Sequence, residues 1–224
     1  MSISPTALAR VAGLGAVAAG ALFIAVQINH PPLDVAFVGT TEFAIRQSMK
    51  IAMAVFALVG ITGMYLSQVR KAGVLGLAGY LVFGAGYLAM FSVEVIGLVV
   101  LPAIASTSPG YVSDILAVAT GGSATGSIGL LGSLNLVAGF GYLLGGLVFG
   151  IALARAHVLA RWASILLAVA TTITMAIPLL PWINQRLFAI PTGVALIGLG
   201  YSLWRQRTPV EVGTTIDALA TAVR

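Results

Sequence analysis

Six long apolar stretches, separated by short polar segments, run along this chain. They cover residues 8–28, 44–66, 73–101, 128–154, 160–180 and 187–204. Five of them exceed, and the last, of 18 residues, approaches, the length of about 20 residues that a helix needs to cross the hydrocarbon core of a bilayer. None has the strict alternation of a membrane β-strand. The pattern predicts an all-α, polytopic bundle of six transmembrane helices.

The first stretch has an alternative interpretation as a cleaved signal peptide. Arg10 precedes its apolar part, and small residues follow at Ala18, Ala19 and Ala21. That apolar part is longer than the apolar region of a typical signal peptide. A retained membrane helix is therefore the preferred interpretation.

The connections between the stretches are unequal in length. Those at 29–43 and 103–127 are long and fall on the same side of the predicted membrane. The second contains Ser108, Pro109 and Gly121, which are typical of the start and end of a helix. We expect an outer interfacial helix over residues 108–120. The polar tail over 205–224 is predicted to be cytoplasmic, and Thr214 and Asp217 have the spacing of a capping box.

The composition agrees with a lipid environment. Of 224 residues, 59% are hydrophobic and 8% are charged, which excludes an ordinary soluble domain and a disordered chain. The absence of cysteine excludes a disulfide scaffold, a thiolate metal site and a cysteine nucleophile.

Lysine and arginine residues predict the orientation. If the N-terminus is cytoplasmic, eight of them lie on the inner side and three on the outer side. Both termini are then cytoplasmic, and the net charge of +5 reflects orientation rather than a nucleic-acid partner. The inner set is Arg10, Arg70, Lys71, Arg155, Arg161, Arg205, Arg207 and Arg224, and the outer set is Arg46, Lys50 and Arg186.

Glycine pairs are placed for close packing between helices. Gly141 and Gly145 are four residues apart, as are Gly146 and Gly150. Because lipid gives apolar helices no hydrophobic reason to associate, small residues at such spacing favour van der Waals packing.

One carboxylate, Glu94, lies within an apolar stretch, and it falls near the predicted outer end. An ionisable group in such a stretch is a candidate functional residue. We expect it to pair with Lys50 or Arg46, which share a helix face. The pair either only neutralises charge near lipid or lines an outward-facing polar pocket. The candidate ligand-binding residues at this end are Glu94, Arg46, Lys50, His30 and Asp34.

No motif indicates catalysis, and no catalytic residue is predicted. His30 and His157 are the only histidines, and they fall on opposite sides of the predicted membrane, which excludes a haem held between them. His30, Asp34 and Glu42 have the donor types of a metal site, but a solvated loop histidine is the usual case. We expect neither a metal nor a cofactor.

The segment Leu153-Ala154-Arg155-Ala156-His157-Val158-Leu159-Ala160-Arg161-Trp162-Ala163 resembles the inner hairpin of uncharacterised six-helix integral membrane proteins of bacteria. The ending over residues 193–204 is similar to the same group. The resemblance implies a multi-pass protein of the bacterial cytoplasmic (inner) membrane and implies no activity.

These observations favour an accessory subunit of a membrane complex or a bundle that binds a ligand or lipid at an outer polar site. A small transporter and a lipid-modifying enzyme are the alternatives. The expected partners are membrane lipids and either another membrane protein or further copies of the chain.

Overall fold

The computed structural model describes residues 4–174 and 185–206, with the side chains of 185 and 186 left out, and this part of the chain contains helices but no strand. The helices are α1 (Pro5–Ala25), α2 (Val35–Val38), α3 (Thr41–Leu66), α4 (Val69–Val99), α5 (Leu101–Ile104), α6 (Pro109–Ala119), α7 (Leu130–Ala156), α8 (Arg161–Ile173), the 3₁₀ helix η2 (Gln185–Phe188) and α9 (Ala189–Arg205).

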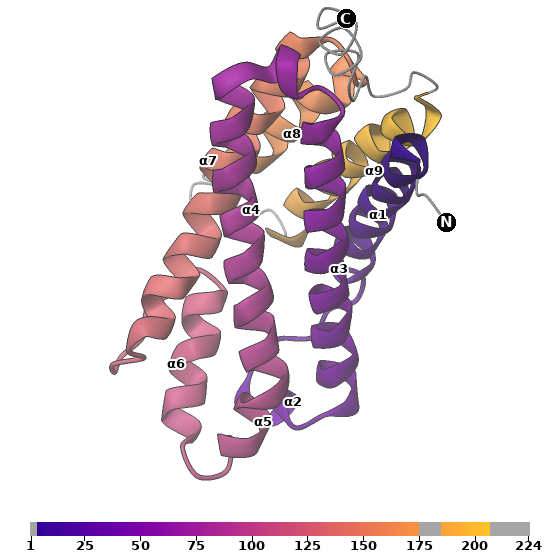
Figure 1. The fold of residues 1–224 in the computed structure, drawn as a ribbon. Helices are drawn as coiled ribbons and strands as arrows, with labels where there is room; N and C mark the ends of the chain where they lie inside the picture. Colours follow the sequence, from indigo (N-terminus) through magenta and orange to yellow (C-terminus); the bar gives the residue numbers. More distant parts are fainter. Residues whose placement is uncertain (1–3, 175–184, 207–224) are drawn as a thin grey trace, which may run out of the picture.

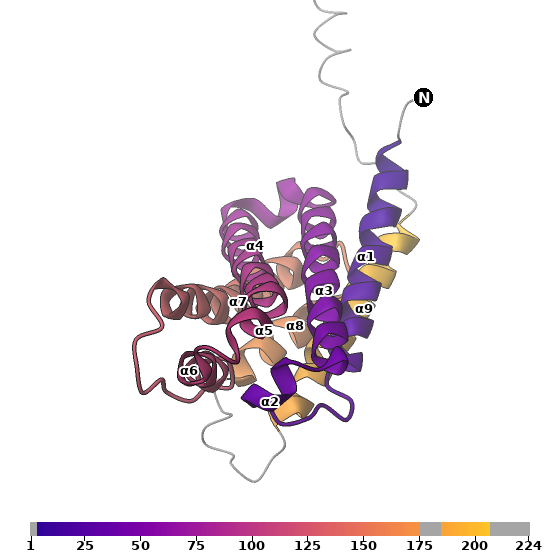
Figure 2. The same cartoon turned by 90° about the horizontal axis from the view of Figure 1, so that it is seen from below.

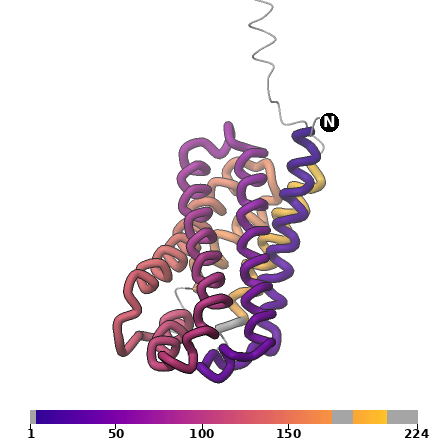
Figure 3. The backbone as a smooth tube through the Cα atoms, turned by 60° about the horizontal axis from the view of Figure 1, so that its bottom comes forward, coloured from indigo at the N-terminus to yellow at the C-terminus, as the bar shows by residue number. Residues whose placement is uncertain are grey.

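The six longer apolar helices form a ring. Going round it, α1 contacts α3, α3 contacts α4, α4 contacts α7, α7 contacts α8, α8 contacts α9, and α9 returns to α1. The view along the bundle shows this order (Figure 2). The short helices α2 and α5, together with α6, lie at one end of the ring (Figure 1). The turns between α3 and α4 and between α7 and α8 lie at the other end, near the start of α1 and the end of α9 (Figures 1 and 3).

Among the described residues, four helices rather than six are long and apolar enough to cross a membrane: α1, α3, α4 and α7. The stretch expected over 160–180 forms the 13-residue helix α8, and residues 175–184 lie outside the described part. The stretch expected over 187–204 forms the 17-residue helix α9.

Polar residues and proline lie at one end of each of the two shorter helices. Near the end of α8, Thr171 and Thr172 donate their hydroxyls to carbonyls of the preceding turn, a bond that bends a helix slightly. In α9, Pro191 falls in the first turn, where a missing N–H is tolerated, and η2 precedes it.

Capping residues extend other helices beyond their predicted starts. Ser4 accepts from the backbone N–H of Ala7 at the start of α1, and Thr40 accepts from that of Phe43 at the start of α3. The helix predicted from residue 73 begins earlier as α4 and kinks at Gly73, whose φ of 58° favours glycine.

The helix predicted over 108–120 forms as α6, but its axis runs along the bundle rather than across its end (Figures 1 and 2). The reason is a second small core. Val112, Ile115 and Leu116 of α6 are buried with Val38 of α2 and Phe43 of α3. An apolar stripe that packs on protein does not need a membrane surface to cover it. Of the predicted tail, only Arg205 and Gln206 are described; the capping-box residues lie outside.

Helix α7 packs through glycine on two sides. A Cβ at Gly141 or Gly145 would collide with the backbone of α4, at Gly86 and Phe83 respectively. A Cβ at Gly146 or Gly150 would collide with α8, at Thr171 and at Ser164 and Ala168 respectively. The four glycines named from the sequence therefore lie at two different contacts of one central helix.

This packing predicts that alanine substitutions at two glycines of α7 differ sharply in their effect on the free energy of unfolding. Gly145→Ala should lower the free energy of unfolding by about 1–3 kcal/mol, because the methyl group has no space against the Phe83 backbone. Gly139→Ala is the matched control, since a Cβ there meets nothing within 4 Å. It should be neutral or stabilising by up to about 1 kcal/mol. Thermal unfolding in detergent measures both; equal effects would contradict close α4–α7 packing.

Candidate functional site

A cavity of about 740 Å³ lies at the end of the ring that carries α2, α5 and α6. Residues of α1, α3, α4, α7 and α9 line it, and the end of α6 closes it at 118–121. Most of its lining is apolar. The polar side chains that line it are Gln27, His30, Lys50, Glu94, Thr120, Asn135 and Tyr142.

Lys50 and Glu94, which line this cavity, belong to a three-residue polar network with Gln47, which is buried beside them. Lys50 Nζ lies 3.4 Å from Glu94 Oε2, so the ion pair expected for Glu94 forms with Lys50. Gln47 connects the two: its Oε1 accepts from Lys50 Nζ at 2.9 Å, and its Nε2 donates to Glu94 Oε2 at 2.7 Å. The Lys50 and Glu94 side chains are 18% and 16% exposed. Partly buried charges among apolar walls are costly unless they are paired, and here each charge has its counter-ion and a shared amide.

Gln47 is a site residue that the sequence reasoning missed. It is uncharged and buried, so a search for ionisable groups in apolar stretches passes over it. The sequence feature that could have identified it is its position: Gln47 precedes Lys50 by three residues and therefore shares that helix face. Gly97, one turn after Glu94, leaves the space for it, because a Cβ at Gly97 would strike the Gln47 amide nitrogen.

Arg46, the other expected partner of Glu94, has a different role. Its guanidinium pairs with Glu42 at 2.8 Å and donates to the backbone carbonyls of Val26, Ile28 and Asn29. These carbonyls follow the end of α1, where a helix carries unsatisfied acceptors and partial negative charge. Arg46 therefore ties the end of α1 to the start of α3, and it does not line the cavity.

His30 and Asp34 also separate. His30 lines the cavity, its Nδ1 lies 2.7 Å from the Pro31 carbonyl oxygen, and its ring lies 6.2 Å from that of Phe37. Asp34 is exposed and caps α2 by accepting from the Phe37 N–H at 2.8 Å. Of the five candidate residues, the structure thus brings Glu94, Lys50 and His30 to one cavity. Within the described ranges, no group of three His, Asp or Glu is placed to hold a metal ion.

Aromatic side chains lie deeper in the bundle, between the cavity and the buried core of the six helices. The Tyr142 hydroxyl is 2.7 Å from Thr192 Oγ1, which joins α7 to α9. Phe23 of α1 stacks on Tyr142 at 6.1 Å between ring centroids. Phe83 lies beneath, among the fully buried residues. These packed rings form the floor of the cavity, and Tyr87, whose ring contacts that of Tyr142, keeps a buried hydroxyl with no hydrogen-bond partner among the described residues.

A hydrogen-bonded clasp holds the loop that follows α6. The carboxylate of Asp114 accepts from the backbone N–H groups of Thr125 and Gly126 and from the Thr125 hydroxyl, at 2.8–3.0 Å. The bond from the Thr125 N–H is the largest cause that lowers the pKa of Asp114. The clasp orders the connection beside Thr120 and Gly121, which line the cavity.

Compared with models of known protein families, with curated protein sequences and with solved structures, the chain matches none of them. The site is therefore interpreted from its own geometry.

The network predicts strong coupling between its two charges. In a double-mutant cycle of Lys50→Met and Glu94→Gln, we expect a coupling free energy between about 0.5 and 3 kcal/mol, because either single change leaves a charge unpaired among apolar walls. The matched cycle of Arg46→Met and Glu42→Gln should give less than about 0.5 kcal/mol, since the Glu42 side chain is 51% exposed. Unfolding in mixed detergent and SDS micelles measures both, and equal couplings would contradict the network.

Proposed function

We propose that this chain is a membrane protein that binds an amphipathic ligand in the cavity between α1, α3, α4, α7 and α9. One observation carries the proposal: a cavity with mainly apolar lining has its two charged side chains, Lys50 and Glu94, paired with each other and bridged by the Gln47 amide. Sites for ligands with an apolar body and a polar head have this division between wide apolar surface and few placed polar groups.

In the proposed topology, the four long helices α1, α3, α4 and α7 cross the bilayer, the shorter α8 and α9 complete the bundle beside them, and both termini are cytoplasmic. Described cations support it: Arg70, Lys71, Arg155 and Arg161 lie at the end of the ring opposite the cavity, as the positive-inside rule requires of a cytoplasmic end. The cavity then opens toward the outer leaflet. The resemblance to six-helix bacterial proteins extends the proposal to the bacterial cytoplasmic membrane.

The paired charges define the head group that fits best. When a zwitterionic head group binds, the contact between Lys50 and Glu94 can be replaced by two contacts with the head group. Its phosphate then faces Lys50 and its ammonium faces Glu94, so that no charge is left unpaired. A primary ammonium also donates hydrogen bonds to a carboxylate, whereas a quaternary ammonium does not. We therefore propose a phosphatidylethanolamine-like lipid as the ligand class.

Binding of this kind suits a lipid-dependent accessory subunit of a larger membrane complex. A transporter has less support, because Glu94 lies within the last two turns of α4 and Lys50 within the first three turns of α3, rather than near the middle of either helix. A lipid-modifying enzyme would need His30 or Glu94 to act on a bound lipid; both line the cavity, but no catalytic motif accompanies them.

Native mass spectrometry in mild detergent tests the proposal, with phosphatidylethanolamine and phosphatidylcholine of identical chains as probes. The wild-type protein should retain phosphatidylethanolamine in preference to phosphatidylcholine. Glu94→Gln and Lys50→Gln should each lower this retention about tenfold or more, because each removes a charge-assisted bond.

Glu42→Gln is the matched control: it removes a carboxylate at the same end that does not line the cavity, and its retention should equal that of wild type. Size-exclusion profiles report folding of each variant. Unchanged retention in both cavity variants, or equal retention of the two lipids by wild type, would contradict the proposal.

A further inference from the structure

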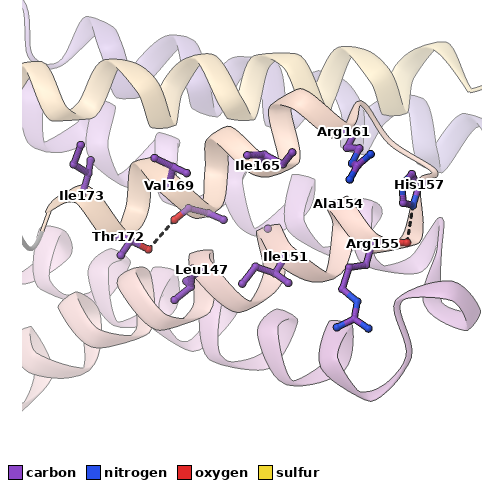
Figure 4. A pocket seen from close by; sticks show the side chains of 12 residues that line it. Leu147, Ile151, Ala154, Arg155, His157, Arg161, Ile165, Val169, Thr172 and Ile173 are labelled. Carbon is purple, nitrogen blue, oxygen red and sulfur yellow. Dashed lines mark hydrogen bonds between the residues drawn. The ribbon is translucent and has the colours of Figure 1, made fainter.

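A second hollow lies between α7 and α8, near the opposite end of the bundle from the cavity. It has a volume of about 580 Å³ and opens on the outside of the ring (Figure 4). Its floor is made of small residues, Gly150, Ala154 and Ala168, where α7 and α8 approach closely. Larger side chains on both helices rise beside this floor, and the result is a groove along the two helices.

The sides of the groove follow a regular spacing of four residues, which places each set on one helix face. Both sets end in an arginine at the α7–α8 turn, as the labelled side chains show (Figure 4). On α7 the set is Leu147, Ile151 and Arg155, and on α8 it is Arg161, Ile165, Val169 and Ile173.

The remaining polar groups of the groove are internally satisfied or lie at its charged end. The Thr172 hydroxyl donates to the Ala168 carbonyl at 2.7 Å. His157, which ends α7 in a left-handed conformation, has its Nδ1 2.8 Å from the Arg155 carbonyl oxygen. The groove is thus apolar along its length and cationic at one end.

The two arginines carry uncompensated charge in the part of the chain that the structure describes. The ion pairs found there are Arg46–Glu42 and Lys50–Glu94, and no carboxylate lies within ion-pair distance of Arg155 or Arg161. The carboxylates that the structure describes, Asp34 before α2 and those of α3, α4 and α6, all lie toward the cavity end of the bundle. The two exposed arginines at this end of the groove therefore favour a partner that carries negative charge.

The length of the groove matches one leaflet. From Arg161 to Ile173 the helix rises about 18 Å, and half of a hydrocarbon core of about 30 Å is roughly 15 Å. An acyl chain laid along the groove would therefore place its head group beside the arginines. In the proposed orientation this is the cytoplasmic leaflet, where anionic lipids attract basic residues close to the membrane.

From these observations we infer that the groove is a binding site for an anionic phospholipid, with one acyl chain between α7 and α8 and the phosphate at Arg155 and Arg161. Guanidinium groups bind phosphate oxygens through paired N–H donors. This site is separate from the cavity, and it does not depend on a ligand being bound there. It gives the two arginines a role beyond orientation, because a positive-inside signal requires only that they lie on the correct side.

The experiment uses full-length protein in mild detergent with phosphatidylglycerol and phosphatidylcholine of identical chains, followed by native mass spectrometry. The wild-type protein should retain one phosphatidylglycerol molecule at a collision energy that removes phosphatidylcholine. The double variant Arg155→Gln/Arg161→Gln should bind phosphatidylglycerol about thirtyfold more weakly, from roughly 1 kcal/mol for each charge near the head groups. Millimolar inorganic phosphate should not displace the lipid, because the acyl chain contributes to binding.

Arg70→Gln/Lys71→Gln is the matched control, which removes two charges from the first turn of α4, at the same end of the bundle. Phosphatidylglycerol binding equal to wild type in this control supports the groove, and a loss as large as that of the arginine pair overturns it in favour of a diffuse basic surface. Unchanged binding in Arg155→Gln/Arg161→Gln also overturns it, as does complete displacement by free phosphate.

A second variant tests the apolar part independently of charge. Ala154→Phe places a ring on the floor of the groove and should weaken phosphatidylglycerol binding, whereas Val82→Phe on the exposed face of α4 should not. Phosphatidylethanolamine retention at the cavity should persist in all groove variants. Phosphatidylglycerol binding therefore tests the groove and phosphatidylethanolamine retention tests the cavity, so that either proposal can fail without the other.

Discussion

Backbone contact through glycine is the interaction on which the arrangement of these helices depends. In lipid, apolar side chains gain little by leaving one apolar surface for another, so helices associate where their backbones come close. Helix α7 does this on both sides, through Gly141 and Gly145 toward α4 and through Gly146 and Gly150 toward α8. A similar contact joins α1 to α9 at Gly13 and Gly200. Gly60 of α3 meets the backbone of α1 at Ala16 in the same way, so four of the six junctions of the ring are of this kind.

The same packing decides where ligands can enter. Where glycine and alanine residues of neighbouring helices face each other, the helices pack closely and the buried core occupies the space between them. Toward the end with α2, α5 and α6, the helices enclose a cavity, and Ala138 and Gly139 of α7 are part of its lining. On the outer surface, the close approach of α7 and α8 leaves small residues at the bottom of a groove. Small residues of α7 therefore line both hollows.

The sequence predicts the features that depend on local pattern. Helix positions, the close-packed glycines of α7 and a partner for Glu94 all follow from hydropathy and spacing. Three-dimensional contacts decide the rest. Arg46 and Lys50 are equivalent on a helical wheel, but the carbonyls at the end of α1 engage Arg46 and leave Lys50 to Glu94. Gln47 joins the site only because Gly97 makes room for it. The described part of α8 ends at Ile173, a boundary that continuous apolarity does not predict.

The most direct test is the placement of the two ends of the ring on opposite sides of a membrane. The chain contains no cysteine, so single cysteines report accessibility without background. Ser67→Cys marks the turn between α3 and α4, and Thr107→Cys marks the segment between α5 and α6. A membrane-impermeant maleimide should label Thr107→Cys in intact cells and Ser67→Cys only after permeabilisation. Labelling of both in intact cells, or the reverse order, would contradict the proposed topology and the outward opening of the cavity.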